Sequence, residues 1–178
     1  MKILRKIVLV ILLLPIVLLV VSFFLPSKYR VERAEVILAQ PEVIYPWLAQ
    51  LRKWPEWTVW STNHDPTIVH SFSGPAEGAG AVMSWKSKAG NFSLKLSEAD
   101  VKTGVKYDLN YEDGTFLCHG GVTMAAVEGG QRVTFSNEGQ LGRHPVRRYL
   151  GLFIDKMMGA EFQQNLQALK KMVESKAN

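Results

Sequence analysis

The stretch Phe-Ser-Leu-Lys-Leu-Ser at residues 92–97 alternates apolar with polar side chains, and this alternation decides the fold. Successive side chains of a β-strand point to opposite faces, so Phe92, Leu94 and Leu96 share one face. The same alternation recurs at 106–111 and 132–136. It is typical of an antiparallel sheet with one covered face and one face in water.

Turn signals divide residues 66–138 into strands of this kind. One strand ends at the segment Gly74 to Gly80, and further turns are predicted at 89–91, 100–104, 112–114 and 128–130. Before these strands, we expect one strand at 31–39, a short helix at 42–51 that Pro41 opens, and a second short helix or turn at 54–60. The chain therefore predicts about seven strands in all.

The apolar period changes to 3.6 residues between Pro145 and Glu174, which predicts an amphipathic helix of about eight turns. We assign its apolar residues to one broad stripe that faces the sheet: Tyr149, Leu150, Phe153, Met157, Phe162, Leu166, Leu169 and Val173. A long C-terminal helix across a curved antiparallel sheet is an α+β fold.

An almost unbroken apolar run, residues 7–25, comes before the first predicted strand. A helix of this length is roughly 28 Å long, close to the thickness of the hydrocarbon core of a bilayer. We predict a single transmembrane anchor in residues 1–30, with a linker at 26–30, and a domain at 31–178. A cleaved signal peptide is the alternative, but the end of the run shows no small-x-small cleavage pattern. Basic residues clustered before the run favour a domain on the periplasmic or other extracytoplasmic side of the membrane.

The positive charge of the chain belongs to its N-terminal segment. The sequence has 21 basic and 16 acidic residues, a net charge of +5, yet residues 1–30 contain five basic residues and no acidic one. Residues 31–178 therefore carry equal numbers of both signs, and we expect no nucleic-acid partner. The only cysteine is Cys118, so no disulfide can form within the chain.

Several motifs along residues 31–174 carry a family resemblance. They are Ala39-Gln-Pro-Glu-Val43, Trp54-Pro-Glu-Trp57, Gly74-Pro-Ala-Glu-Gly-Ala-Gly80, Gly130-Gln-Arg-Val-Thr134, Glu138-Gly139, Pro145, Arg148-Tyr149, Gly151-Leu152, Asp155-Lys-Met157, Gly159 and Leu166-Gln-Ala-Leu-Lys170. In these motifs the chain resembles the START-like, or helix-grip, superfamily (SRPBCC), within its polyketide cyclase/dehydrase and lipid-transport group. The resemblance implies a helix-grip fold and a ligand cavity between the sheet and the C-terminal helix. It implies no catalytic residues, because the group shares no catalytic motif.

The cavity residues follow from the predicted inner faces of the strands and the helix. They are Met83, Trp85, Phe92, Leu94, Tyr107, Leu109, Tyr111, Phe116, Phe135, Phe153 and Met157. None is charged, so the predicted ligand is a hydrophobic or lipid-like small molecule that few hydrogen bonds orient. The alternative is that these side chains fill one another's space. Gly159, inside the long helix, indicates either close packing or space left for a ligand.

Few residues of the sequence suggest catalysis. Cys118 and His119 are neighbours in a strand, so they point to opposite faces and cannot form a nucleophile–base pair. The spacing of His64, Asp65 and His70 matches no metal site, and no glycine-rich loop suggests a nucleotide, so we expect neither a metal nor a cofactor. We predict a membrane-anchored carrier of a hydrophobic small molecule. The alternatives are a cyclase- or dehydratase-like enzyme with Tyr107 or Tyr111 as proton donor or acceptor, and a scaffold for another envelope protein.

Overall fold

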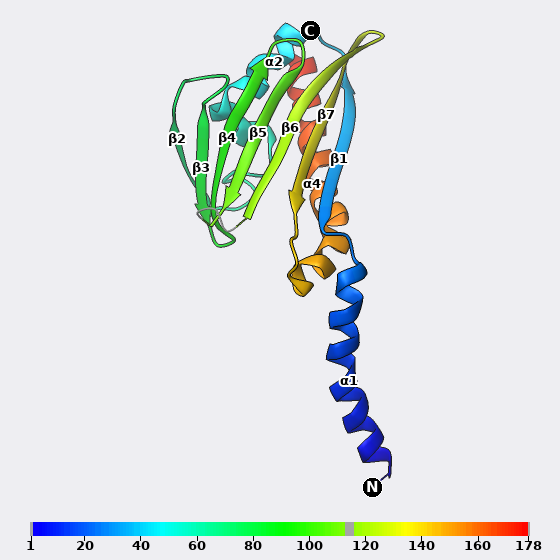
Figure 1. The fold of residues 1–178 in the computed structure, drawn as a ribbon. Helices are drawn as coiled ribbons and strands as arrows, with labels where there is room; N and C mark the ends of the chain where they lie inside the picture. Colours follow the sequence, from blue (N-terminus) through cyan, green and yellow to red (C-terminus); the bar gives the residue numbers. More distant parts are fainter. Residues whose placement is uncertain (1, 113–115, 178) are drawn as a thin grey trace.

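The computed structural model describes residues 2–112 and 116–177, and its main element is a seven-stranded antiparallel sheet (Figure 1). The order across the sheet is β1-β7-β6-β5-β4-β3-β2. The strands are β1 (Lys28–Ile37), β2 (Val69–Ser73), β3 (Val82–Ser87), β4 (Gly90–Asp100), β5 (Gly104–Tyr111), β6 (Phe116–Val127) and β7 (Gly130–Gln140). The predicted α+β architecture is confirmed. The turn predicted at 112–114 lies partly outside the described residues.

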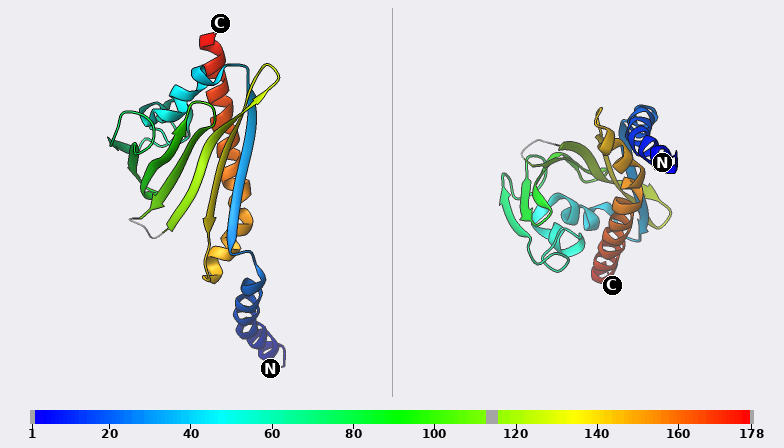
Figure 2. Two further views of the ribbon diagram at one scale, coloured as in Figure 1. Left: turned by 45° about the horizontal axis from the view of Figure 1, so that its top comes forward. Right: turned by 90° about the horizontal axis from the view of Figure 1, so that it is seen from below.

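Helices cover the inner, concave face of this sheet. They are α2 (Pro41–Ala49), a 3-10 turn η1 (Leu51–Lys53), α3 (Trp54–Trp57) and α4 (Pro145–Ala177), whereas α1 (Lys2–Phe24) lies beyond the end of the sheet. Figure 2 shows α2 and α4 on the concave side, with α4 running along β1 and α1 extending beyond the sheet. Strand β1 begins at Lys28 rather than at residue 31, so it includes the last three residues of the predicted linker.

The register of the strands confirms the predicted alternation. In β7 the side chains of Val133, Phe135 and Asn137 are buried, and the residues between them are more exposed. Cross-strand pairing places Phe135 opposite Val122 of β6, and Leu94 of β4 opposite Leu109 of β5. Apolar residues of neighbouring strands therefore share the concave face, where their burial from water stabilises the fold.

Aromatic rings fill the centre of this concave face. The ring of Phe162 in α4 stacks on Phe135 of β7, with centroids 4.2 Å apart and planes 4° from parallel. Trp54 and Trp57 of α3 lie 6.3 Å and 6.1 Å from the same Phe135 ring. Both tryptophans are buried, and Trp60 is half-buried. The centre of the core is therefore built from side chains of β7, α3 and α4.

The predicted stripe of α4 is wrong in the N-terminal half of the helix. Phe162 and the later stripe residues are buried, but Leu150, Phe153 and Met157 are 57%, 59% and 67% exposed. Phe153 precedes Phe162 by nine residues, which is about two and a half turns, so the two side chains point in opposite directions. The apolar residues of α4 thus form two separate stripes, one on each side of the helix.

An ion pair under α4 occupies the space beside Gly159. The Arg33 guanidinium donates to both carboxylate oxygens of Asp155, at 3.0 Å and 3.1 Å, and to the backbone oxygen of Glu32. A Cβ atom on Gly159 would overlap with this guanidinium. Gly159 therefore marks close packing between α4 and β1. The space beside it is filled by the Arg33 side chain rather than by a ligand.

The Arg33–Asp155 pair makes stability depend on pH in the acid range. The hydrogen bonds that Arg33 donates to the Asp155 carboxylate lower the pKa of Asp155. A lowered pKa in the folded state stabilises the protein above the usual carboxyl pKa, about 4, and this contribution is lost as the pH falls through the lowered value. We expect Asp155→Asn to lower the free energy of unfolding at pH 7, and we expect this difference from the wild type to shrink as the pH falls into the acid range. Urea unfolding of both proteins across this range measures the difference, and a difference that does not change with pH would contradict the role of the ion pair.

The last turn of α1 is bound to the start of α4. Arg148 Nη1 donates to the backbone oxygens of Ser22 and Phe23, each at 3.0 Å, and Tyr149 Oη donates to the oxygen of Leu18 at 2.7 Å. The bonds from Arg148 reach carbonyls in the last turn of α1, where a helix leaves backbone oxygens without partners from the next turn. Among the residues that the structure describes, no helix is both long and apolar enough to cross a membrane, and the transmembrane prediction for 7–25 is not confirmed.

Candidate functional site

Most of the predicted cavity residues share the concave face, but they differ in exposure. Five are buried in the core: Met83, Trp85, Leu94, Tyr107 and Phe135. Four on β4, β5 and β6 are half-buried: Phe92, Leu109, Tyr111 and Phe116. The last two, Phe153 and Met157, lie on the outward side of α4 and line no interior space, because the helix turns them away from the sheet.

Protein side chains occupy the centre of the predicted cavity. A series of ring contacts runs from the core towards the end of the sheet: Trp54 to Trp60 at 6.0 Å, Trp60 to Trp85 at 5.4 Å, Trp85 to Phe92 at 5.0 Å and Phe92 to Tyr111 at 4.9 Å. The interpretation that these side chains fill one another's space is therefore correct for the centre. A hollow of about 780 Å³ lies along β2 to β5; Ser84 and Ser93 line it, and so do Trp85 and Phe92 of the predicted cavity residues.

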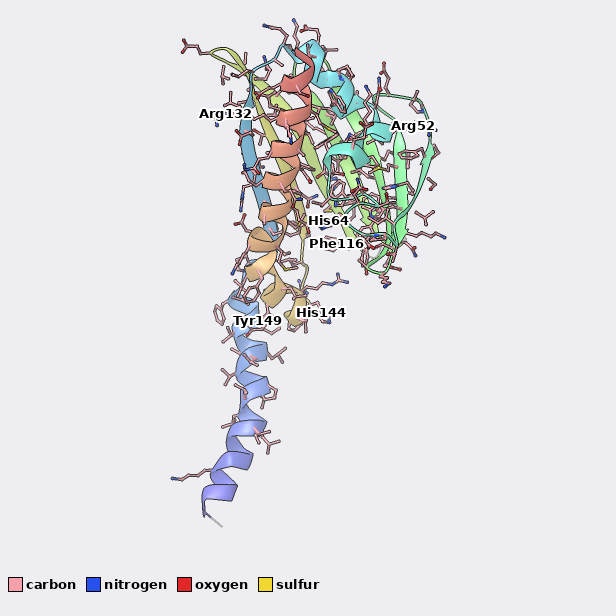
Figure 3. The ribbon with its side chains drawn as sticks, turned by 180° about the vertical axis from the view of Figure 1, so that it is seen from behind. Arg52, His64, Phe116, Arg132, His144 and Tyr149 are labelled. Carbon is pink, nitrogen blue, oxygen red and sulfur yellow. The ribbon has the colours of Figure 1, made fainter. Side chains whose placement is uncertain are left out.

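The four half-buried residues form what we call the aromatic patch: Phe92, Leu109, Tyr111 and Phe116. Strand pairing sets Phe92 opposite Tyr111, and Tyr111 opposite Phe116, so the patch crosses three strands on one face. Phe116 lies at the end of the sheet that is nearer to α1, as Figure 3 shows. Helix α4 runs along β1 rather than over β4 and β5, and the patch keeps part of its apolar surface in contact with water.

A cluster of polar side chains adjoins this patch on the inner face. Tyr29 Oη donates to Asn137 Oδ1 at 2.8 Å, and Asn137 Nδ2 lies 3.5 Å from Tyr107 Oη and 3.4 Å from Cys118 Sγ. Tyr107 Oη donates to the backbone oxygen of Ser136 at 3.1 Å. We call Tyr29, Tyr107, Cys118 and Asn137 the polar cluster. Its buried polar groups are satisfied within the protein, as buried polar groups generally are.

Glycines make room for the two tyrosine rings of the cluster. Gly120 of β6 stands opposite Tyr107, and a Cβ atom there would overlap with the ring. Gly139 of β7 stands opposite Tyr29, and its Cβ would lie 2.7 Å from the ring. Each ring therefore lies across the backbone of the neighbouring strand. Sequence reasoning missed Tyr29 and Asn137 as members of the site, because these pairings depend on a register that alternation alone does not fix.

The titratable groups of the polar cluster stay protonated near neutral pH. Burial raises the pKa of Tyr29, Tyr107 and Cys118 above their ordinary values. A buried thiol of this kind is a poor nucleophile, because the thiolate is the reactive form. The cluster is therefore suited to donating and accepting hydrogen bonds rather than to transferring protons.

The histidines lie apart from the polar cluster. His119 points outward from β6, with Nδ1 at 2.6 Å from Asp108 Oδ1, while its neighbour Cys118 points inward, as predicted. His70 Nε2 lies 2.9 Å from the backbone oxygen of Trp60. In the described part of the chain, no three histidine, cysteine, aspartate or glutamate side chains are placed to hold a metal ion.

Comparison with known proteins extends these observations. The family model described as polyketide cyclase / dehydrase and lipid transport matches residues 28–174. No sequence among curated proteins matches the chain.

Solved structures show the same fold at low sequence identity. A protein of unknown function from Staphylococcus aureus has a TM-score of 0.65 at 12% identity, over 84% of this chain and 96% of its own. The di-domain ARO/CYC StfQ from the steffimycin biosynthetic pathway also has a TM-score of 0.65 at 12% identity, over 85% of this chain and 52% of its own. A protein from Chromobacterium violaceum has a TM-score of 0.53 at 20% identity, over 84% and 98%.

Proposed function

The chain belongs to the polyketide cyclase / dehydrase and lipid transport family, and on that basis we propose that it binds a hydrophobic or lipid-like small molecule at the aromatic patch. The observation that carries the proposal is the partial exposure of this apolar surface on an otherwise buried face. A ligand that covers the patch removes apolar area from water, which is worth about 25 cal/mol for each Å².

A ligand on the patch would meet the polar cluster at Tyr29, because the other three members are buried and bonded within the protein. Tyr29 is half-buried, its ring stacks on Phe116 at 6.3 Å with planes 11° apart, and its hydroxyl reaches Asn137. Tyr29 thus joins the patch to the cluster. A mostly apolar surface with a few converging polar groups is the usual composition of a small-molecule site.

The hydroxyl groups of Tyr107 and Tyr111 favour binding over the alternative of a cyclase or dehydratase, because both are already hydrogen-bonded within the protein. The hydroxyl of Tyr107 donates to Ser136, and burial raises its pKa, so it is a weak acid at neutral pH. The hydroxyl of Tyr111 donates to the backbone oxygen of Ala89 at 3.2 Å, at the turn between β3 and β4. A general acid or base works best with a pKa near the working pH and a free path to the substrate.

We further propose that α1 attaches the domain to a membrane. The apolar run at 7–25 supports this, and so does the exposure of its described side chains, such as Leu12 at 65% and Phe23 at 60%. An exposed apolar surface of this extent is typical of a membrane or protein contact. The basic residues before the run favour an extracytoplasmic domain. Attachment would keep the aromatic patch close to the lipid phase, where hydrophobic ligands concentrate.

Phe116 and Leu117 provide a test of the binding site, because they are neighbours on β6 that face opposite sides of the sheet. Glutamine at Phe116 replaces apolar contact with a polar group, so we expect binding to weaken about tenfold, or ~1.4 kcal/mol. Glutamine at Leu117, which is 46% exposed, should leave binding unchanged. The probe is a photoreactive fatty acid added to the full chain in nanodiscs, with the labelled peptides identified by mass spectrometry.

The position of the label gives the second part of the result. Labelling of peptides from β4 to β6, weakened by Phe116→Gln alone, supports the proposed site. Equal labelling of the wild type and both variants, or labelling confined to α1, would show that the patch does not hold the fatty acid.

A further inference from the structure

The outward side of α4 changes from apolar to polar along the helix. Its first residues form what we call the α4 stripe: Val146, Leu150, Phe153 and Met157, which are 57–67% exposed. Spacings of four and three residues place them on one side of the helix. Farther along the same side the residues are Gln164, Gln167 and Lys171. The side turned away from the sheet is thus apolar only in the half of α4 that starts at Pro145.

This apolar half lies beside α1. Arg148 and Tyr149, within the first turns of α4, hold the backbone oxygens of Leu18, Ser22 and Phe23. Figures 1 and 3 show the start of α4 next to the end of α1, with the polar half of α4 farther away. The α4 stripe therefore begins next to the end of α1, whose described apolar side chains are also exposed.

Basic residues surround the α4 stripe. Arg143, Arg147 and Lys156 are exposed, and Asp155, the one acidic residue between 142 and 157, is bound to Arg33. Apolar residues on one side of a helix, flanked by arginine and lysine, are typical of helices that lie at the surface of a membrane with anionic lipids. The charge around the stripe therefore matches a phospholipid surface.

We propose that the N-terminal half of α4 lies at the membrane surface, with the α4 stripe in contact with lipid acyl chains. This inference rests on the proposed attachment of α1 to the membrane, and it adds a second contact that fixes the orientation of the domain. Because Phe116 lies at the end of the sheet nearer to α1 (Figure 3), this orientation turns the aromatic patch towards the lipid. In this orientation a hydrophobic ligand has only a short path between the bilayer and the aromatic patch.

Fluorescent labels at three positions test the inference on the full chain. Cysteine replaces Val17 in α1, Phe153 in the α4 stripe, or Gln164 on the same side of α4 beyond the stripe, each with Cys118→Ala. The three labelled side chains are exposed, and the buried Cys118→Ala substitution is shared by all three proteins, so its effect on the core is the same in each. The protein is labelled with NBD and inserted into vesicles of phosphatidylcholine and phosphatidylglycerol that contain a nitroxide-labelled phosphatidylcholine.

Quenching of NBD by the nitroxide lipid reports contact with acyl chains. We expect several-fold quenching at 17 and at 153, and none at 164. Quenching at 17 but not at 153 would leave the attachment of α1 in place and overturn the inference about α4. Absence of quenching at 17 would overturn the attachment, and the inference with it. A blue shift of the NBD emission at 153 without quenching would show that protein, rather than lipid, covers the α4 stripe. Equal quenching at 153 and 164 would show that contact with lipid does not end at the polar half of α4. Either result overturns the proposal.

Discussion

Replacement of Phe162 by alanine is expected to lower the free energy of unfolding by about 3–5 kcal/mol. The Phe162 side chain is buried at the centre of the core, where its ring stacks on Phe135. Alanine would remove these ring contacts and leave a cavity that neighbouring rings can fill only in part. Denaturant unfolding of the full chain in detergent, followed by tryptophan fluorescence, measures the loss.

Phe153 on the same helix is the matched control. It is 59% exposed on the opposite side of α4, so alanine there should change the free energy of unfolding by less than about 0.5 kcal/mol. A loss of similar size at both positions would mean that the two sides of α4 are not distinct. That result would also remove the structural basis of the α4 stripe.

Trp54→Ala is expected to cost a similar amount, about 3–5 kcal/mol. Trp54 is fully buried, and its ring lies within 6.3 Å of the rings of Trp57, Trp60, Tyr107 and Phe135. Its Nε1 also donates to the backbone oxygen of Leu48 at 2.9 Å. The substitution would open an apolar cavity between α3 and the sheet, and thermal and urea unfolding would measure its cost.

Trp54→Phe separates packing from hydrogen bonding at this position. Phenylalanine keeps most of the ring but cannot donate to Leu48, so we expect a loss of only about 1–2 kcal/mol. If Trp54→Ala proved as stable as the wild type, the centre of the protein would not be filled in the way described. If benzene binds to Trp54→Ala, the variant contains an apolar cavity, and this would confirm that the Trp54 side chain fills that space in the wild type.

Alternation of side chains was enough to predict the sheet. Phe92, Leu94 and Leu96 share the face that the sequence assigns to them, and the turns that glycine marks separate the observed strands. This part of the fold depends on a period of two residues, which local sequence displays directly. The apolar period of residues 145–174 predicted a helix across the sheet, but the order of the strands was not predicted, because it depends on contacts between distant residues.

The candidate site was predicted only in part, for two physical reasons. In a helix of 33 residues such as α4, apolar residues nine positions apart, such as Phe153 and Phe162, lie on opposite sides, although each fits a helical period with its nearer neighbours. In addition, a row of inward apolar residues does not tell whether a ligand or another side chain lies against them. Here Trp54 and Trp60 take that place, and Asn137, a polar residue in an apolar strand face, gave no signal before its partners were known.

The pairing of β1 with β7 determines when this domain can fold during its synthesis. Lys28 pairs with Gln140 and Ile37 with Gln131, so the first strand to leave the ribosome finds its partner only after about a hundred more residues have been made. Closure over so long a loop is entropically costly and slow. A chain truncated before β7 would leave the backbone of β1 without this partner, a state that favours aggregation.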